Sequence, residues 1–289
     1  MRFETESLGP IGVEIRGLDL RGDVSEADFA WLRRTVTDEG LVLLRDQPME
    51  AARHVALGER FGPPEKLDIK REGPDPSLAV IHNVDREGSA FADDDPLMEM
   101  LTINEGWHSD SAFREIPASF TLFAAVVVPD EGGDTLYACL QRAWDALDPE
   151  EQVKLYGLNG IHDYSAAFRQ RGKEMARLVG FELPALTHPL VRRHPETGRV
   201  GLFVSEHMNG IEGMAKEEGK ALVEKLVALV TSEDRVYRHR WQVGDLLIWD
   251  NRSTLHRAQG FDERYARVMH HVRVSGSEPP IAATAPRTV

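Results

Sequence analysis

The sequence predicts a mainly β protein with outer α-helices, folded as a double-stranded β-helix, the cupin-like jelly-roll barrel. Many short apolar and β-branched runs, separated by glycine and proline, are typical of strands in such a barrel. A few segments with helical periodicity lie between these runs, which indicates helices packed outside the barrel. A possible metal-binding pair, His108 and Asp110, stands at the expected end of a strand. These three features together favour the jelly-roll barrel.

The N-terminal part alternates strand and helix signals. A glycine-containing, alternating segment within the first twenty residues predicts a hairpin. Ser25 caps a helix in which Phe29, Leu32 and Val36 recur at helical spacing, and Gly40 ends it. The next expected elements are a strand at 41–44, a helix at about 49–60, a loop at 63–77, a strand at 78–81 and an acidic loop at 85–97. This acidic loop is either a solvated run or a lid over the adjacent residues, and loop position favours the lid.

The remainder of the chain contains mostly strand signals. We expect strands at 121–128 and 135–137, helices at about 140–157 and 165–178, a hairpin of 188–193 with 198–204, a helix at 215–230, and strands at 236–241, 246–249 and 266–274. Leu222, Leu226 and Leu229 form the expected inner face of the helix at 215–230. We predict one domain over residues 1–275, with a helical insertion at about 140–180. Residues 276–289 read as a loose C-terminal tail.

Composition narrows the classes of function. The 289 residues carry a net charge of −14, which argues against a nucleic-acid partner and against docking on an anionic membrane. The single cysteine, Cys139, excludes an internal disulfide and a thiolate zinc cluster. The N-terminus has no apolar signal core, and no apolar run is long enough to span a bilayer. We therefore expect a cytoplasmic protein that forms a homo-oligomer and acts on a small molecule.

The segment from Trp107 to Asp110 carries the first chemical signal. His108 and Asp110 are two residues apart, so in an extended segment both side chains leave the same face. An imidazole and a carboxylate there can bind one divalent metal ion, and His256 is the best downstream candidate for a third ligand. Two histidines and one carboxylate form the facial triad of non-haem Fe(II) oxygenases, which leaves metal positions open. Taken alone, each residue has an ordinary structural explanation.

Further motifs accompany this triad in the same chain order. Gly132-Gly133-Asp134-Thr135 follows the His-x-Asp pair, and Trp249-Asp250-Asn251-Arg252 precedes His256, which Arg267 follows. In this combination the chain resembles the taurine and 2,4-dichlorophenoxyacetate dioxygenase family, from the strand at 41–44 to Arg273. It looks most similar to the aryloxyalkanoate branch, given Val236 to Trp241 and Arg267-Val268-Met269.

The resemblance implies an oxygenase that depends on Fe(II), 2-oxoglutarate and O2. It makes His108, Asp110 and His256 the iron ligands, and Arg267 with Thr135 the partners of the distal 2-oxoglutarate carboxylate. A planar guanidinium meets a carboxylate with two parallel hydrogen bonds, and a hydroxyl adds a third. By themselves, Arg267 would more often be a surface residue and Thr135 a plain strand residue.

Substrate recognition is expected from four further residues. Where the taurine branch holds its substrate anion with an arginine, this chain has His271, which argues against taurine. Arg273 lies on the same strand face as His271 and either supplies the cation or is exposed at the barrel rim. By resemblance, Asn104 lies near the substrate, and Phe168 is either an aromatic pocket wall or ordinary helix packing.

The sequence thus predicts hydroxylation of a small organic acid, most simply an aryloxyalkanoate-like ether. Hydroxylation beside the ether oxygen gives a hemiacetal that collapses to a phenol and an oxo acid, with release of succinate and CO2 from 2-oxoglutarate. The alternative substrates are taurine or another alkylsulfonate, or a sulfate ester. A metal-binding barrel without catalysis is a second class, and it leaves Arg267 and Thr135 unexplained.

Overall fold

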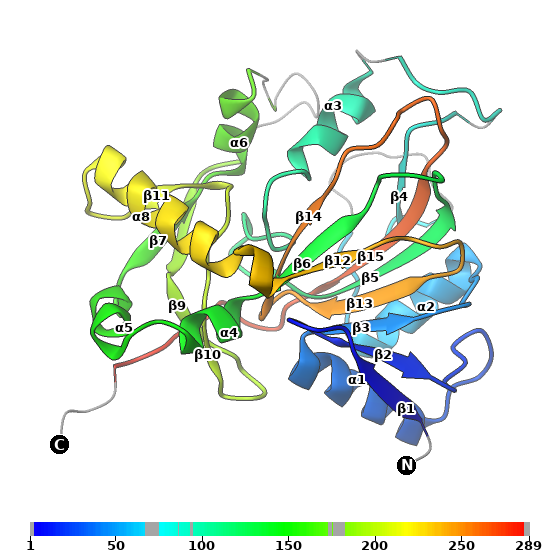
Figure 1. Cartoon of the computed structure of the whole chain (residues 1–289), viewed down its shortest axis with the longest axis horizontal. Helices are drawn as coiled ribbons and strands as arrows, with labels where there is room; N and C mark the ends of the chain where they lie inside the picture. The colour runs from blue at the N-terminus through cyan, green and yellow to red at the C-terminus, as the bar shows by residue number, and fades with distance from the viewer. Residues whose placement is uncertain are drawn as a thin grey trace.

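Two sheets that face each other form the centre of the computed structural model, which describes residues 3–66, 75–85, 87–92, 95–172, 175 and 183–285 (Figure 1). The larger sheet has the order β1 (Glu4–Ser7), β2 (Val13–Arg16), β3 (Leu41–Leu44), β13 (Leu246–Asp250), β5 (Ala118–Val127), β15 (Val268–Ser275) and β4 (Ala79–His82). The smaller sheet has the order β12 (Val236–His239), β6 (Thr135–Cys139) and β14 (Thr254–Ala258). In the described residues these sheets are separate, and neither closes on itself.

Alternation along the strands of the larger sheet separates two cores. On β13, Leu247 and Trp249 face the smaller sheet and pack with Tyr137 of β6. Leu246 and Ile248 face the other way, toward the helices α1 (Glu26–Glu39) and α2 (Ala51–Phe61). The fold is thus a mixture of helices and several sheets, with α1 and α2 packed outside the larger sheet, and it is more helical than the mainly β protein that the sequence predicts.

Most N-terminal elements follow the sequence prediction. The β1–β2 hairpin is antiparallel, Ser25 accepts a hydrogen bond from the Asp28 amide at the start of α1, and Gly40 ends α1 in the left-handed region at φ 79°. One helix in this part was not predicted. It is α3 (Pro96–Ile103), which begins inside the predicted acidic loop at 85–97. Of that predicted loop, residues 86, 93 and 94 lie outside the described residues, as do 67–74 of the predicted 63–77 loop.

The predicted helical insertion also contains a strand, β7 (Asn159–His162). The helix expected at 140–157 is divided into α4 (Leu140–Asp145) and α5 (Pro149–Leu155), since Pro149 starts a new helix and cannot continue the old one. A third sheet follows, in the order β11 (Met208–Ile211), β7 (Asn159–His162) and β8 (Leu186–Pro189). Helix α6 (Tyr164–Gln170) covers the first half of the helix predicted at 165–178, whose later residues lie mostly outside the described ones.

The C-terminal helix and tail differ from expectation in detail. Helix α8 (Lys216–Val230) buries Val223, Leu226 and Val227, while Leu222 and Leu229 are only partly buried, so its inner face is rotated. Within the tail predicted to be loose, β16 (Ile281–Ala282) pairs with β9 (Val191–Arg193), which also pairs with β10 (Val200–Leu202). Backbone pairing holds this part of the tail in place. A short 3-10 helix, Glu233–Arg235, precedes β12. No helix in the described part of the chain is both long and apolar enough to cross a bilayer.

Candidate metal centre and active site

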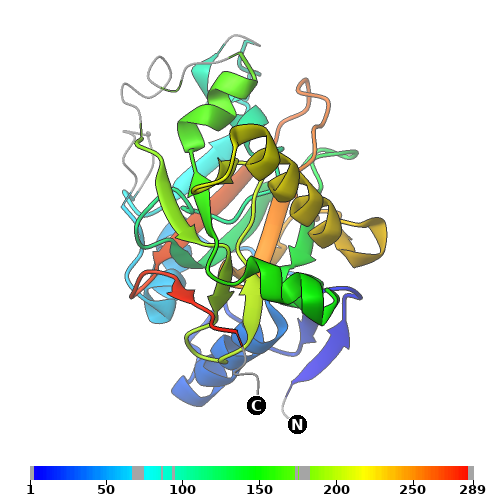
Figure 2. The same cartoon turned by 90° about the vertical axis from the view of Figure 1, so that its left-hand side faces the viewer.

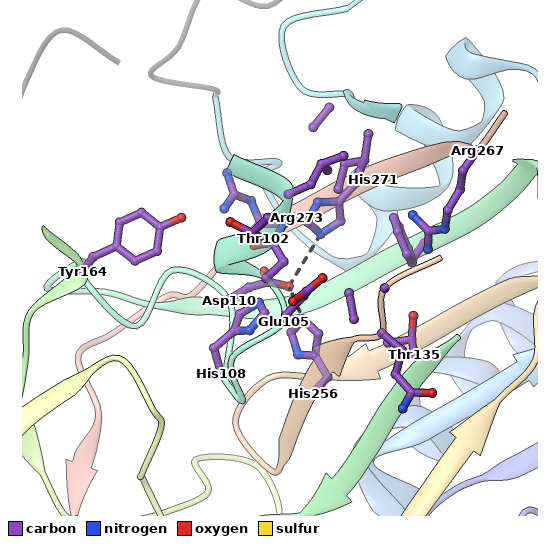
Figure 3. Close-up of a pocket in the computed structure, with 18 of the residues that line it drawn as sticks. Thr102, Glu105, His108, Asp110, Thr135, Tyr164, His256, Arg267, His271 and Arg273 are labelled. Carbon is purple, nitrogen blue, oxygen red and sulfur yellow. Dashed lines mark ion pairs between the residues drawn. The ribbon is translucent and has the colours of Figure 1, made fainter. Parts of the chain in front are cut away.

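Three side chains, those of His108, Asp110 and His256, converge in the pocket (Figure 3). His108, Asp110 and His256 each offer one ligand atom, these atoms lie within 4.8 Å of one another, and all three residues are buried. The structure therefore brings together the three residues that the sequence predicts as a facial triad.

Main-chain hydrogen bonds fix the two histidines relative to each other. The His108 amide donates to the His256 carbonyl at 2.9 Å, and the His256 amide donates to the His108 carbonyl at 2.8 Å. His256 lies on β14, a strand that the sequence prediction missed. Ser109, between the ligands, donates its hydroxyl to the Thr254 carbonyl on the same strand. The His-x-Asp segment is thus held against β14.

Both histidines are suited to bind a metal as neutral ligands. Burial is the main cause that lowers the pKa of His108 and holds the pKa of His256 well below its ordinary value. His108 places Nδ1 2.7 Å from the Gly106 carbonyl, so donation there leaves Nε2 with a free lone pair. The Nδ1 atom of His256 is buried without a hydrogen-bond partner.

The carboxylate of Asp110 is held by a buried hydrogen-bond network. Thr121 of β5 donates its hydroxyl to Asp110 Oδ2 at 2.7 Å, and the Asn251 side chain accepts from the Asp110 amide and donates to Thr121. Burial acts to raise the pKa of Asp110, but His256, His271 and Arg273 outweigh it and keep that pKa well below the usual range. The Asp110 carboxylate is therefore charged and oriented, so it could serve as a metal ligand. The sequence carries no signal for Thr121, and it marks Asn251 only as part of the Trp249–Arg252 motif.

A cavity of about 200 Å³ extends from the triad to Arg267 and Thr135. Arg267 is 7% exposed, and among the described residues no carboxylate lies within 4.0 Å of its guanidinium. Its Nη2 donates to the Gly133 carbonyl at 3.3 Å, while Nε has no partner. Burial lowers the pKa of Arg267 to about 10. A buried guanidinium of this kind fits the carboxylate of a ligand.

The surroundings of Arg267 leave room for its side chain and fix its backbone. Gly133 has φ 67°, and a Cβ at that position would lie 3.1 Å from Arg267 Nε. Asn83, fully buried, accepts from the Arg267 amide at 2.7 Å and donates to two carbonyls of the preceding loop. Thr135 accepts from the Trp241 indole at 3.0 Å, which leaves its own hydroxyl hydrogen to donate. Asn83 and Trp241 have no signal in the sequence that marks them as supporting residues.

The β15 strand carries His271 and Arg273 on the same side as Arg267, and all three side chains line the cavity (Figure 3). His271 Nε2 lies 3.6 Å from Asp110 Oδ2. Arg273 Nε lies 3.4 Å from Glu65, whose side chain is 3% exposed and also accepts from the Ser111 hydroxyl at 2.7 Å. The ion pair with Glu65 thus fixes the position of the Arg273 guanidinium. This buried carboxylate was not among the residues predicted from the sequence.

The part of the cavity nearest α3 and α6 is apolar and aromatic. Phe168 is completely buried, packs with Ile103 and Met175, and is also among the residues that line the cavity. Phe113 stacks on Tyr164 with ring centroids 4.6 Å apart. Asn104 lines the cavity as well. The cavity therefore has a metal-ligand region, a cationic end at Arg267 and an apolar wall.

Comparison with known proteins connects this geometry to a family. The family model described as "Taurine catabolism dioxygenase TauD, TfdA family" matches residues 4–274. The chain belongs to this family. That membership confirms the family predicted from the sequence and makes the chain a dioxygenase.

Two relatives illustrate the likeness in sequence. The alpha-ketoglutarate-dependent 2,4-dichlorophenoxyacetate dioxygenase of Cupriavidus pinatubonensis is 34% identical over 254 residues, covering 86% of this chain and 88% of that protein. The (S)-phenoxypropionate/alpha-ketoglutarate-dioxygenase of Sphingobium herbicidovorans is 32% identical over 283 residues, covering 95% of this chain and 94% of that protein. Both relatives are similar along nearly their whole length.

Solved structures show the same likeness in three dimensions. AAD-2 in complex with Mn(II) and N-oxalylglycine superimposes with a TM-score of 0.87 at 29% identity, covering 98% of this chain and all of that one. A taurine dioxygenase from Burkholderia xenovorans superimposes with a TM-score of 0.80 at 25% identity, covering 99% of this chain and 95% of that one. The family's fold is therefore retained throughout the chain.

Proposed function

We propose that this dioxygenase depends on Fe(II) and 2-oxoglutarate and hydroxylates a small aryloxyalkanoate-like acid. One observation carries the proposal: a single cavity connects the candidate ligand atoms of His108, Asp110 and His256 with the guanidinium of Arg267. That guanidinium is buried, and no carboxylate among the described residues forms an ion pair with it. A metal site without turnover does not need Arg267, whereas a keto acid with a second carboxylate needs both ends. When bound, Fe(II) supplies the oxidation with O2, and 2-oxoglutarate leaves as succinate and CO2.

In this proposal the chain's own residues bind and orient the two organic acids. His108, Asp110 and His256 hold the metal and leave positions open for the keto acid end of 2-oxoglutarate. Arg267 and Thr135 bind its distal carboxylate. The buried Arg267 guanidinium thereby gains the anionic partner that no described side chain supplies. The names of both aligned relatives include alpha-ketoglutarate, which supports the same co-substrate here.

The substrate class follows from the cavity and the relatives together. Phe113, Tyr164 and Phe168 give the cavity an aromatic wall, on which an aryl ring packs favourably. Arg273, anchored by Glu65, supplies a cation for the substrate carboxylate, with His271 and Asn104 beside it. Hydroxylation of the carbon beside the ether oxygen yields a hemiacetal, which collapses to a phenol and an oxo acid. The aligned relatives are named for substrates of this kind.

A substrate panel tests the proposal directly. The enzyme with Fe(II), 2-oxoglutarate and O2 is offered phenoxyacetates, phenoxypropionates, taurine and a sulfate ester, while succinate and the phenol are measured. We expect aryloxyalkanoates to give the highest kcat/KM, with phenol formed in step with succinate. Highest turnover of taurine or of the sulfate ester would instead assign the alternative substrate class. Absence of succinate with every acid would contradict the proposed reaction.

Arg273→Ala is expected to raise KM for an aryloxyalkanoate by about 10- to 100-fold, because a charge-assisted hydrogen bond contributes about 1.5–3 kcal/mol. Uncoupled turnover of 2-oxoglutarate without substrate should change little, since neither the metal ligands nor Arg267 is altered. Steady-state kinetics with and without substrate separate the two effects. Arg21→Ala removes an exposed arginine that does not line the cavity and serves as the control. Equal KM values for Arg273→Ala and the wild type would remove Arg273 from substrate binding.

Thr121→Val is expected to lower Fe(II) affinity by about 10- to 100-fold, the usual effect of losing a group that orients a metal ligand. The substitution keeps the side-chain shape but removes the hydroxyl that donates to Asp110 and accepts from Asn251. Metal titration of the apoenzyme, followed by intrinsic fluorescence, measures the change. Thr35→Val, which removes a partly buried hydroxyl within α1, is the matched control. Undiminished affinity would show that Thr121 does not orient Asp110.

The proposal also covers the organisation of the chain. We infer that residues 1–275 form one domain in which the two facing sheets make a double-stranded β-helix, or jelly-roll. The shared core of Leu247, Trp249 and Tyr137 between the sheets supports this arrangement. We further propose a homo-oligomer located in the cytoplasm. Size-exclusion chromatography with light scattering and fractionation of the source cells test these last two points.

A further inference from the structure

The buried residue Glu65 contacts both the segment that follows Asp110 and the strand that carries Arg273. Its own segment follows α2 and runs beside β15, next to which α2 also lies (Figure 2). The Glu65 amide donates to the Arg273 carbonyl at 2.8 Å, and the preceding Pro64 pairs with Val274. The side chain of Glu65 is only 3% exposed, so protein groups rather than water must stabilise its charge.

One oxygen of this carboxylate, Oε2, meets groups from both sides. It accepts a hydrogen bond from the Ser111 hydroxyl at 2.7 Å, and it lies 3.4 Å from Arg273 Nε. Arg114 Nε, at 3.9 Å, is a second and more distant cation. Because Ser111 and Arg273 share a single acceptor atom, any displacement of that oxygen alters both contacts.

Ser111 has an uncommon backbone conformation directly after a candidate metal ligand. Its φ is 55°, in the left-handed region that residues other than glycine rarely adopt, and the residue is buried. Such a conformation persists only where the surrounding structure holds it. Here the Ser111 hydroxyl donates to Glu65, and the Ser111 carbonyl accepts from the Arg114 amide at 2.9 Å. The hydrogen bond to Glu65 therefore helps to fix the backbone that presents Asp110.

We propose that Glu65 is a positioning residue that couples substrate binding to metal binding, through Arg273 on one side and Ser111 on the other. This inference rests on the proposed function, in which Arg273 binds the substrate carboxylate. A substrate bound there fixes the Arg273 guanidinium and, through it, the Glu65 oxygen that holds Ser111. The same arrangement of Ser111 presents the Asp110 carboxylate to a metal. Each ligand should therefore bind more tightly when the other is present, and by the same factor.

Equilibrium binding of Mn(II) under anaerobic conditions tests this coupling without turnover. The metal-free full chain is titrated with Mn(II) in the presence of 2-oxoglutarate, with and without saturating phenoxyacetate, and electron paramagnetic resonance measures the free ion. The ratio of the two Kd values is the coupling factor. We expect phenoxyacetate to tighten Mn(II) binding by about tenfold in the wild type, near the low end of typical coupling between two sites.

Three variants separate coupling from a merely structural effect. Ser111→Ala removes the hydroxyl, and Ser111→Gly does the same while accommodating the positive φ without strain. Glu65→Gln keeps an acceptor for the Ser111 hydroxyl but removes the charge that pairs with Arg273. Direct attraction between the metal and the substrate anion is retained in all three. We expect the coupling factor to fall at least threefold in each, whereas a merely structural role would weaken both titrations equally.

Ser109→Ala is the matched control. This serine also lies in the segment of the candidate ligands, but its hydroxyl donates to the Thr254 carbonyl of β14 rather than to Glu65. Its loss should weaken Mn(II) binding equally with and without phenoxyacetate. A wild-type coupling factor in Ser111→Gly and Glu65→Gln, or an equal fall in Ser109→Ala, would overturn the role of Glu65 alone. Failure of phenoxyacetate to bind the wild type would contradict both this role and the proposed substrate class.

Discussion

Arg267→Ala is expected to raise the 2-oxoglutarate requirement by about two to three orders of magnitude. In the proposed complex, Arg267 and the distal carboxylate form a buried ion pair, and removal of one partner from such a pair typically costs about 3–5 kcal/mol. The effect should be large because Arg267 is buried and, among the described residues, no carboxylate lies within 4.0 Å of its guanidinium. Titration of 2-oxoglutarate, followed both by binding to the Fe(II) enzyme and by succinate formation, gives the two measurements.

Two companion variants make the Arg267 experiment specific. Arg267→Lys keeps the charge but not the two parallel donors. Its 2-oxoglutarate requirement should therefore lie between those of Arg267→Ala and the wild type. Arg264→Ala removes an arginine of the same loop that is 85% exposed, and it should leave the requirement unchanged. If Arg267→Ala binds 2-oxoglutarate as tightly as the wild type, Arg267 is not the carboxylate partner.

Asp110→Ala and His256→Ala are each expected to abolish turnover and to remove the weak visible absorption band of the anaerobic enzyme with Fe(II) and 2-oxoglutarate. That band requires a chelate at the open positions beside the three ligands, and two remaining ligands hold a metal poorly. Absorption spectra under anaerobic conditions, with circular dichroism to verify the fold, provide the readout. His82→Ala, which alters a histidine outside the triad, should retain both the band and the activity. Persistence of the unchanged band in the ligand variants would show that the ligand assignment is wrong.

The fold was predictable from the sequence where local patterns carry the information. A continuous apolar run marks β13, and the Ser25 cap with a helical repeat marks α1. Strand β14 was missed, although it carries His256, because its five residues mix polar and charged types without alternation. Helix α3 was missed because a proline after an acidic run reads as a loop. Only packing against distant strands decides the structure of such segments.

The candidate site divides in the same way. Recognisable motifs contain the triad, Thr135 and Arg267. The residue types and spacing of these motifs, with the family resemblance, were enough to select these residues. Thr121, Glu65 and Asn83 have no such signal, because each acts through hydrogen bonds or ion pairs that only the folded chain brings together. A threonine in a buried strand looks the same whether or not an aspartate lies opposite. The supporting residues therefore became visible only in three dimensions.

The main-chain bridge between His108 and His256 has a consequence for the order in which the protein assembles. The two residues lie far apart along the chain, so the bridge forms only after a long loop has closed, which is slow compared with local structure. Main-chain hydrogen bonds set the spacing of His108 and His256, so the folded apoenzyme already has this spacing. We therefore expect iron to bind after folding rather than to nucleate folding. Pulsed hydrogen exchange during refolding can check this order: both amides should gain protection together, late, and at the same rate with or without metal.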